Sequence, residues 1–507
     1  MDFEILTTAL FTAFSPLVLQ AVALGTLWGV IIGALPGLGS VIAISLCLPF
    51  TYAMPPLAGI ATLLGAYCGS VYGGSISAIL LNTPGTAQSA ATCFDGYPMA
   101  QKGESDRALG WCTSSSVIGG IFSCIVLIVL GPTLARYSLK FGPIETCTLI
   151  VLALTCIASV SAGNTFKGIL AGCIGLFLST IGLDPMGGDT RFDFGIFALL
   201  AGIDLVAIVV GVFAFTEVFW RASSMLDESS YLLKYQGIKF PTWADWKGRF
   251  GVLFRSCVIG TVVGILPGTG AATASFISYA EAKRSSPNSD KFGTGEPDGI
   301  IAPESANNAV TGGALIPTLA LGIPGDAVTA IMLVTLTLHG IQPGVRLLKE
   351  NPETVYGAFI ILIVANLCMV VCGILVARFF AKLLKIPEAL LMAAIIIFCF
   401  LGSYGVRSSM FDLITALSAG ALGFVFRYFK VPLAPLVIGM VLGRPLELSL
   451  SQALLLTDMN FFAFYTFDHP IALVLLAIFL FVLCMPGIRA WRARKKLSPS
   501  IASEKGE

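Results

Sequence analysis

Charged side chains are scarce in this chain, and one long stretch has none. Asp, Glu, Lys and Arg make up 12% of the 507 residues, whereas soluble domains carry about 25%. None occurs from Ile5 to Phe94, a length that holds several membrane spans of about 20 residues each. A soluble core of that length would have no charges to keep it in solution. The sequence therefore predicts an all-α polytopic membrane protein, and a net charge of +1 argues against a nucleic-acid partner.

The chain also lacks the motifs of common catalytic, nucleotide and metal sites. It contains no His-Glu-x-x-His and no Cys-x-x-Cys, and its thirteen cysteines are scattered through apolar runs. We therefore expect no disulfide framework and no transition-metal site. Gly268-Thr-Gly270 lacks the Lys-Ser/Thr of a phosphate-binding loop. The isolated His339 and His469 are expected at loops or interfaces rather than in a proton relay. We expect no enzyme, no ATP-driven transport and no cofactor other than a coupling ion.

One apolar motif is present twice. Residues 29–39 read Gly-Val-Ile-Ile-Gly-Ala-Leu-Pro-Gly-Leu-Gly, and residues 260–270 read Gly-Thr-Val-Val-Gly-Ile-Leu-Pro-Gly-Thr-Gly. Further Gly and Pro pairs follow in the same order, while their offset drifts from 231 to 248. A duplication followed by small insertions leaves this pattern, so we predict two structural repeats. Segments interrupted by Gly and Pro at matching places in two halves point to a transporter's binding site.

Polar stretches divide the chain. Charged residues gather with Pro and Trp between the two copies, and basic residues follow the last apolar run. These features predict five parts: a first membrane repeat at 1–222, a polar linker at 223–250, a second membrane repeat at 251–445, a terminal segment with the last span at 446–488, and a basic cytoplasmic tail at 489–507. A further polar stretch from Glu281 to Glu304 has no equal in the first copy, and we expect it to be an inserted solvent loop.

Charge bias suggests how the repeats are oriented. Lys102, Arg107 and the linker are expected in the cytoplasm, because Lys and Arg favour that side. The mixed charges from Arg346 to Glu353 could lie outside. We therefore favour repeats of opposite topology over parallel ones, although short re-entrant hairpins keep both arrangements open. The apolar runs predict about 12 spanning or re-entrant segments.

Two kinds of Pro-Gly motif interrupt the apolar runs, because Pro lacks an N–H and Gly is permissive. The first kind predicts a hinge or broken helix in each half, at Pro36, Gly37 and Gly39 and at Pro267, Gly268 and Gly270. The second kind suits the tip of a re-entrant hairpin and supplies the predicted substrate-binding residues, Asn82, Thr83, Pro84, Gly85 and Thr86 and Ile323, Pro324, Gly325 and Asp326. Free N–H groups at such tips can bind an anion. The alternative is a proline kink with close glycine packing.

An acid and two amides enter an apolar run at Glu304, Ser305, Asn307 and Asn308. Such groups are unfavourable in a membrane unless they are paired or functional, and their oxygens suit Na⁺. We predict a cation site there for Na⁺, with H⁺ as the other coupling ion. The alternative is a helix start at a membrane face, capped by Ser305 or Asn307. Asp326 could likewise bind a cation or cap the helix that follows it.

Basic side chains are missing from the segments around the predicted tips. No Lys or Arg occurs from Ile5 to Phe94 or from Ser305 to Val345. We therefore expect a bound anion to be balanced by backbone N–H groups at the tips and by co-bound cations. Na⁺ and substrate should then each raise the affinity of the other.

A set of motifs, specific in combination, resembles one family. In the first half they are Gly33-Ala-Leu-Pro-Gly-Leu-Gly39, Tyr72-Gly-Gly-Ser75, Asn82-Thr-Pro-Gly-Thr86 and Asp95-Gly-Tyr-Pro98. In the second half they are Gly264-Ile-Leu-Pro-Gly-Thr-Gly270, Pro303-Glu-Ser-Ala-Asn-Asn308, Leu321-Gly-Ile-Pro-Gly325 and His339-Gly-Ile-Gln-Pro-Gly344. With these motifs, the chain resembles the large membrane subunit of the tripartite tricarboxylate transporters, the TctA family, across residues 15–445.

The resemblance implies a multi-pass permease of the bacterial inner membrane. Such permeases work with a small four-helix membrane subunit and a periplasmic solute-binding protein. They import di- or tricarboxylates, with citrate as the default, on a cation gradient that is usually Na⁺. One departure is Asp326, where we expect a small hydroxyl residue in the family. The alternative function is a non-transporting membrane receptor or channel subunit, and a homodimer is one of the oligomeric states left open.

Overall fold

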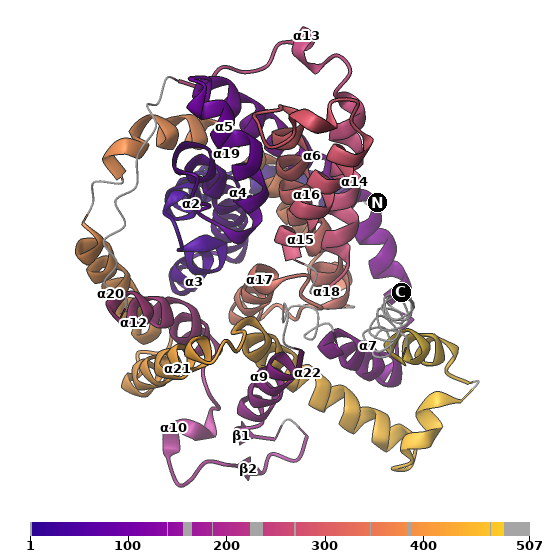
Figure 1. The fold of residues 1–507 in the computed structure, drawn as a ribbon. Helices are drawn as coiled ribbons and strands as arrows, with labels where there is room; N and C mark the ends of the chain where they lie inside the picture. Colours follow the sequence, from indigo (N-terminus) through magenta and orange to yellow (C-terminus); the bar gives the residue numbers. More distant parts are fainter. Residues whose placement is uncertain are drawn as a thin grey trace, which may run out of the picture.

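The computed structural model describes residues 3–138, 140–155, 165–184, 186–223, 237–267, 270–344, 346–383, 387–466 and 468–480 (Figure 1). Gly268, residues 224–236 of the predicted linker and the predicted basic tail lie outside these residues. The described part of the chain is mostly helical with almost no sheet, which confirms the all-α fold class. Its strands are limited to one antiparallel pair, β1 (Gly182–Leu183) and β2 (Thr190–Arg191).

Helices of very different length follow one another along the chain. In the first half they are α1 (Phe3–Ala13), α2 (Pro16–Ala34), α3 (Gly39–Thr51), α4 (Pro56–Leu81), η1 (Ala87–Thr92), α5 (Cys93–Gln101), α6 (Ser105–Ser138), α7 (Pro143–Thr155), α9 (Thr165–Ser179), α10 (Phe197–Leu200), α11 (Leu205–Val209), the π-helical turn η2 (Val210–Phe215) and α12 (Thr216–Ser223). In the second half they are α13 (Trp243–Trp246), α14 (Phe250–Ile265), α15 (Gly270–Ser285), η3 (Ser289–Lys291), α16 (Asp298–Leu321), α17 (Ala327–Leu338), α18 (Leu347–Glu350), α19 (Pro352–Leu383), α20 (Glu388–Gly405), α21 (Met410–Tyr428), α22 (Ala434–Leu456) and η4 (Phe461–Tyr465).

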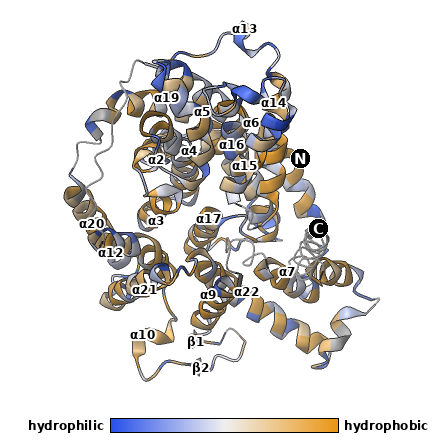
Figure 2. Cartoon of the chain, viewed as in Figure 1, coloured by the Kyte–Doolittle hydropathy of each residue, from blue (hydrophilic) through white to orange (hydrophobic). Residues whose placement is uncertain are grey.

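Several helices are suited to a bilayer. Seven helices in the described ranges are long and apolar enough to cross a membrane. Large apolar side chains such as Leu24, Val129 and Val371 are exposed on them. Hydrophilic residues gather instead at the end of the molecule that carries α13 and the start of α14 (Figure 2). This distribution supports the predicted multi-pass membrane protein.

The Leu-Pro-Gly motifs are hairpin turns. Gly25, Gly29 and Gly33 of α2 lie against the backbone of Thr62, Ala66 and Ser70 of α4, so α2 and α4 run parallel. The end of α3 lies beside the start of α4, because Gly59 contacts Thr51. Therefore α3 returns antiparallel to α2, and the turn at 35–38 reverses the chain. Glycines allow this close approach because they have no Cβ.

The second Leu-Pro-Gly motif has the same surroundings. Gly260 and Gly264 of α14 lie against Ala306 and Val310 of α16, which again makes the two helices parallel. Leu266 ends α14 with φ −81° and ψ 108°, and Leu35 ends α2 with φ −80° and ψ 119°. Both turns therefore leave the helix in the same extended conformation.

Long helices of one half pack against long helices of the other half. Gly119 of α6 lies against Ser305 of α16, and Ser123 lies against Gly312, so these helices are parallel. In the same way α19 is parallel to α4, since Gly357 contacts Leu57 and Gly373 contacts Tyr72.

Two further contacts fix the direction of α4 relative to α6. The Tyr72 hydroxyl of α4 bonds Thr113 of α6. Asn366 contacts both Cys68 of α4 and Cys124 of α6. Cys68 precedes Tyr72 in α4, whereas Cys124 follows Thr113 in α6. The helices α4 and α6 are therefore antiparallel, and α4 and α16 point in opposite directions. A second group, which includes α7, α9, α21 and α22, lies below them in Figure 1.

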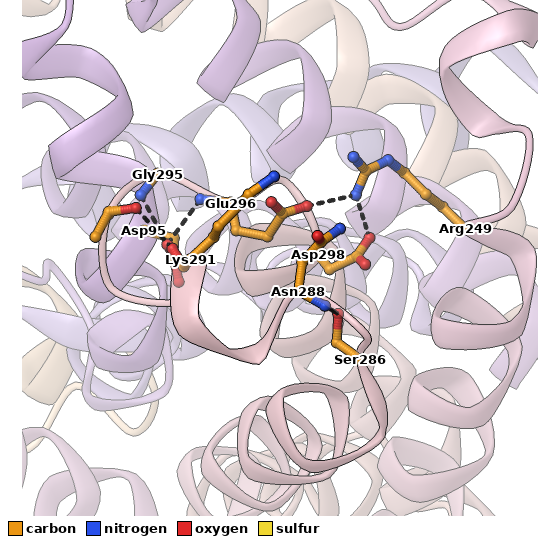
Figure 3. A network of polar contacts seen from close by, with 9 residues as sticks. Asp95, Arg249, Ser286, Asn288, Lys291, Gly295, Glu296 and Asp298 are labelled. Carbon is orange, nitrogen blue, oxygen red and sulfur yellow. Dashed lines mark hydrogen bonds and ion pairs between the residues drawn. The ribbon is translucent and has the colours of Figure 1, made fainter.

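The polar stretch after α15 is a loop that Asp95 holds by hydrogen bonds. Oδ1 of the fully buried Asp95 accepts hydrogen bonds from the N–H groups of Gly293, Gly295 and Glu296. Arg249 pairs with Glu296 and Asp298 beside it (Figure 3). The predicted solvent loop is wrong at both of its ends: Glu281 belongs to α15, and the residues from Asp298 to Glu304 belong to α16.

The same end of the molecule holds the basic residues expected in the cytoplasm. Lys102 donates a hydrogen bond to the Thr294 carbonyl oxygen at 2.6 Å. The N–H of Lys239, within the predicted linker, donates to the carbonyl oxygen of Asp106 at 2.9 Å. The start of α6, this part of the linker and the 286–297 loop therefore lie on one side.

Candidate functional site

A cavity of about 440 Å³ lies where both hairpin turns and both tips meet. Gly39 and Gly270 line it from the Leu-Pro-Gly turns, and Thr86 and Asp326 line it from the Pro-Gly tips. The fold thus brings together four motifs that are far apart in the sequence, one of each kind from each half.

Four helix N-termini open on this cavity. They belong to α3, which begins at Gly39, to α15, which begins at Gly270, and to the helices that follow Thr86 and Asp326. Gln88 Nε2 donates a hydrogen bond to Ser40 Oγ at 2.9 Å and so joins two of these ends. A helix N-terminus carries about half a positive charge and N–H groups without a partner in its own helix. At α17 the Asp326 carboxylate already accepts the Thr329 N–H, so the ends of α3 and α15 make the part of the wall that is suited to an anion.

The predicted hinge residues form the turns and not a kink in a continuous helix. Gly37, Gly39 and Gly270 have φ of +81°, +75° and +73°, values that favour glycine. The Pro36 carbonyl oxygen accepts a hydrogen bond from Arg221 Nη2 at 2.8 Å. Pro267 occupies the second turn, and Gly268 lies outside the described residues.

The tips place only part of their predicted residues at the cavity. Asn82 ends α4 in the left-handed region with φ 57°, as Gly322 ends α16 with φ 73°. The chain then folds back, so that the Gly85 N–H donates to the Gly74 carbonyl oxygen. Thr86 and Asp326 face the cavity, while Thr83 and Pro84 are half-buried beside Gly85.

Close packing explains the remaining tip residues. A Cβ on Gly85 would lie 1.9 Å from the Gly33 carbonyl oxygen, and one on Gly325 would lie 2.7 Å from Ala314. Pro324 is buried next to Gly325, and Ile323 packs in an apolar cluster with Leu442. These residues pack the tips against the helices, and the neighbouring Thr86 and Asp326 line the cavity instead.

Asp326 caps the helix that it precedes. Its Oδ1 accepts hydrogen bonds from the N–H and hydroxyl of Thr329. Its Oδ2 accepts a hydrogen bond from the Tyr67 hydroxyl at 2.6 Å. The carboxylate also lines the cavity. It therefore combines a structural role with a negative charge at the candidate site.

The predicted cation residues lie inside α16 and are completely buried. Glu304 accepts hydrogen bonds from Ser75, Thr92 and Ser116, which all come from the first half of the chain. The alternative of a helix start at a membrane face is wrong, because α16 begins at Asp298. Ser305 donates to the Ile301 carbonyl oxygen of its own helix.

Polar atoms without a hydrogen-bond partner occur within one helical turn after Glu304 and next to its partner Ser116. Both side-chain polar atoms of Asn307, Oδ1 of Asn308 and Oγ of Ser115 have no hydrogen-bond partner within the described residues. Buried polar groups are normally paired, so these oxygens, together with the carboxylate, fit a small cation. In the same described ranges, no cluster of three or more His, Cys, Asp or Glu side chains could hold a metal ion.

Sequence reasoning missed a charged pair on the cavity wall. Arg427 of α21 and Glu217 of α12 line the cavity. The expectation that no basic side chain would face an anion here is therefore wrong. These residues stand near the ends of apolar runs, where they read as flanking charges. The sequence did contain one indication of a charged cluster: Glu217 and Arg221 are four residues apart at the end of an apolar run, a spacing that lets them pair on a helix.

Known proteins are similar to this chain in sequence. Residues 19–438 match the model of the tripartite tricarboxylate transporter TctA family. A 52.8 kDa protein in the TAR-I ttuC' 3' region of Agrobacterium vitis is 36% identical over 489 residues, which cover 95% of this chain and 96% of the relative. A protein in the TAR-II ttuC' 3' region of the same organism is 36% identical over 236 residues, 46% of this chain and 97% of the relative. The chain thus belongs to the TctA family of tripartite tricarboxylate transporters, and it is a multi-pass membrane transport protein and not an enzyme.

Proposed function

We propose that the chain is the large permease subunit of a binding-protein-dependent secondary transporter that imports di- or tricarboxylates such as citrate. The observation that carries the proposal is the cavity on which four helix N-termini converge. The test is uptake of labelled citrate into proteoliposomes that contain all three subunits, with and without a Na⁺ gradient. Citrate uptake that requires the gradient supports the proposal, and uptake that is indifferent to Na⁺ and to any proton gradient contradicts it.

The cation site of this transporter is proposed at Glu304, Asn307 and Asn308. The support is a buried carboxylate with orphaned amide oxygens beside it. The four helix ends together supply about two positive charges, and the Asp326 carboxylate places a negative charge among them, so they do not offset a di- or tricarboxylate by themselves. Na⁺ or H⁺ therefore enters with the substrate and is bound with positive coupling.

The architecture proposed is two repeats of opposite topology with about 12 spanning or re-entrant segments. Three correspondences support it. The residues that end α2 and α14 have the same extended backbone conformation. The residues that end α4 and α16 are both in the left-handed region, and α4 and α16 point in opposite directions.

Cysteine labelling tests this arrangement. In a cysteine-free background, a cysteine at Tyr52 and one at Asn288 should react with a membrane-impermeant reagent from opposite sides. By charge bias, Asn288 should be the cytoplasmic one, because its loop lies with Lys102 and the linker. Labelling of both positions from one side would contradict the inverted arrangement.

The partners proposed are a small four-helix membrane subunit and a periplasmic solute-binding protein, with the complex in the bacterial inner membrane. The family to which the chain belongs is tripartite. The chain's own polar stretches reach only about 30 residues, whereas domains need about 50 or more. High-affinity uptake by this chain alone in liposomes would contradict the dependence on a binding protein.

A further inference from the structure

Three charged side chains form a chain of contacts on one wall of the cavity. Glu217 Oε1 pairs with Arg221 Nε at 2.6 Å, and Glu217 Oε2 pairs with Nη1 of Arg427. Arg221 in turn donates to the Pro36 carbonyl oxygen in the first hairpin turn. The cluster therefore joins α12 and α21 to the broken segment between α2 and α3.

The local backbone directs Glu217 at the cavity. The π-helical turn η2 ends immediately before Thr216, and both Thr216 and Glu217 line the cavity. The Thr216 hydroxyl donates to the Gly420 carbonyl oxygen at 3.2 Å, which ties α12 to α21 at this level. Such turns insert one residue and re-aim the side chains that follow, and they are frequent at functional sites.

Two guanidinium groups, those of Arg221 and Arg427, pair with the single carboxylate of Glu217. Glu217 is nearly buried, whereas 37% of the Arg427 side chain is exposed and faces the cavity. Arg427 also lies 4.6 Å from the ring centroid of Trp220, which supports the plane of its guanidinium group. A guanidinium group has five N–H donors in a planar fork, so Arg427 can bind a second carboxylate while it still contacts Glu217.

We propose that Arg427 is a substrate-binding residue that pairs with one carboxylate of an anion whose other carboxylate lies at the helix N-termini that line the same cavity. The site then selects anions with at least two carboxylate groups over monocarboxylates. This inference rests on the proposed function and identifies the part of the cavity that binds the second carboxylate of the substrate. Arg221 makes the exchange feasible: when Arg427 turns to the substrate, Glu217 keeps a partner and is not left as an unpaired buried charge.

The test is direct binding to the purified chain, so that the selectivity of a solute-binding protein does not enter. Citrate, succinate and acetate are titrated in Na⁺ buffer, and the shift of the unfolding temperature with concentration yields each affinity. We expect the wild type to bind succinate at least about tenfold more tightly than acetate. We expect Arg427→Gln to weaken citrate and succinate binding by about tenfold or more, as the loss of a charge-assisted pair predicts, and to leave acetate binding unchanged.

The matched control is Arg407→Gln. Arg407 is similarly exposed at 33%, and it pairs with Asp204 and Asp412 at the other end of the contact between α11 and α21, away from the residues that line the cavity. It should keep the wild-type affinities. If Arg427→Gln does not fold, Arg427→Lys decides, because a lysine lacks the fork and should still weaken succinate binding several-fold.

Two results would overturn the inference, and they differ from failure of the proposed function. Succinate and citrate affinities of the Arg427 variants that equal those of Arg407→Gln would show that Arg427 does not touch the substrate. An equal loss for acetate would show a general effect on the cavity and not a second-carboxylate site. Failure of the wild type to bind any of the three anions would instead remove the proposed function, and the inference with it.

Discussion

The hydroxyl of Tyr67 lies 2.6 Å from Oδ2 of Asp326 and donates a hydrogen bond to it. This contact joins the middle of α4 in the first half to the tip of the second half. Both residues line the cavity, and Tyr67 is almost fully buried. The bond therefore holds an acidic tip in place beside a site suited to anions.

Replacing Tyr67 with Phe should loosen this contact. The carboxylate of Asp326 keeps its bonds to Thr329 but loses its donor from α4. Because a hydrogen bond to a charged group contributes about 1.5–3 kcal/mol, the free energy of unfolding should fall by a similar amount. Chemical unfolding in detergent measures it, with Tyr52→Phe at an exposed position as the control. Equal stability of the two variants would show that the bond contributes nothing.

Replacing Asp326 with Asn should reduce the dependence of substrate binding on Na⁺. The amide oxygen can still cap α17, but the negative charge that faces the anion is gone. A like-charge pair in a partly buried site is unfavourable by about 1–3 kcal/mol, so citrate affinity without Na⁺ should rise about tenfold. Citrate titrations with Na⁺ and with choline test this. The exposed Asp290→Asn is the control, and an unchanged Na⁺ effect in Asp326→Asn would refute the idea.

Replacing Glu304 with Gln, or Asn308 with Ala, should weaken the Na⁺ dependence of uptake more than membrane insertion. The cation would lose a charged ligand or an amide oxygen inside α16. Uptake is measured against Na⁺ concentration, and insertion is measured by the amount of folded protein in the membrane. Glu145→Gln is the matched control, since Glu145 is also a buried acid but pairs with His469. A Glu304→Gln curve that matches the control would remove Glu304 from the cation site.

Replacing Gly85 or Gly325 with Val should abolish uptake while the protein still inserts and folds. The new Cβ would meet the backbone at Gly33 or at Ala314, so the tip must move away from the cavity. The cause is thus a displaced tip, and not a blocked approach of the substrate to the backbone. Gly251→Val is the control, because nothing lies within 4 Å of its Cβ position. Normal uptake by both tip variants would contradict this role.

Replacing Asp95 with Ala should release the loop between α15 and α16. Three loop N–H groups and the Tyr279 hydroxyl would lose their acceptor. Limited proteolysis in detergent should then cut within residues 286–297, where the wild type resists. Asp290→Ala, in the same loop but exposed, should remain resistant. An uncut Asp95→Ala protein would show that other contacts hold the loop.

Much of the site could be anticipated from the order of residues alone. Pro36 and Pro84 interrupt apolar runs, and Pro267 and Pro324 do the same at matching places, so turns were expected there. Glu304 stands out because an acid within an apolar run demands partners. These inferences depend on local chemistry. A missing N–H, a missing Cβ or an unfavourable buried charge has the same local effect in any fold.

Other features depended on which distant segments meet. The Leu-Pro-Gly motifs read as hinges, but Gly29 on Ala66 shows that α2 and α4 run parallel and that the chain reverses between them. The partners of Glu304 are 188 to 229 positions away.

The sequence by itself determined that the protein is helical, lies in a membrane and carries repeated Pro-Gly turns, because composition and backbone chemistry are local properties. Only the tertiary structure decided that both turns and both tips share one cavity, and that Arg427 stands on its wall. Helix packing sets those distances, and packing is a property of pairs of segments that no single segment contains.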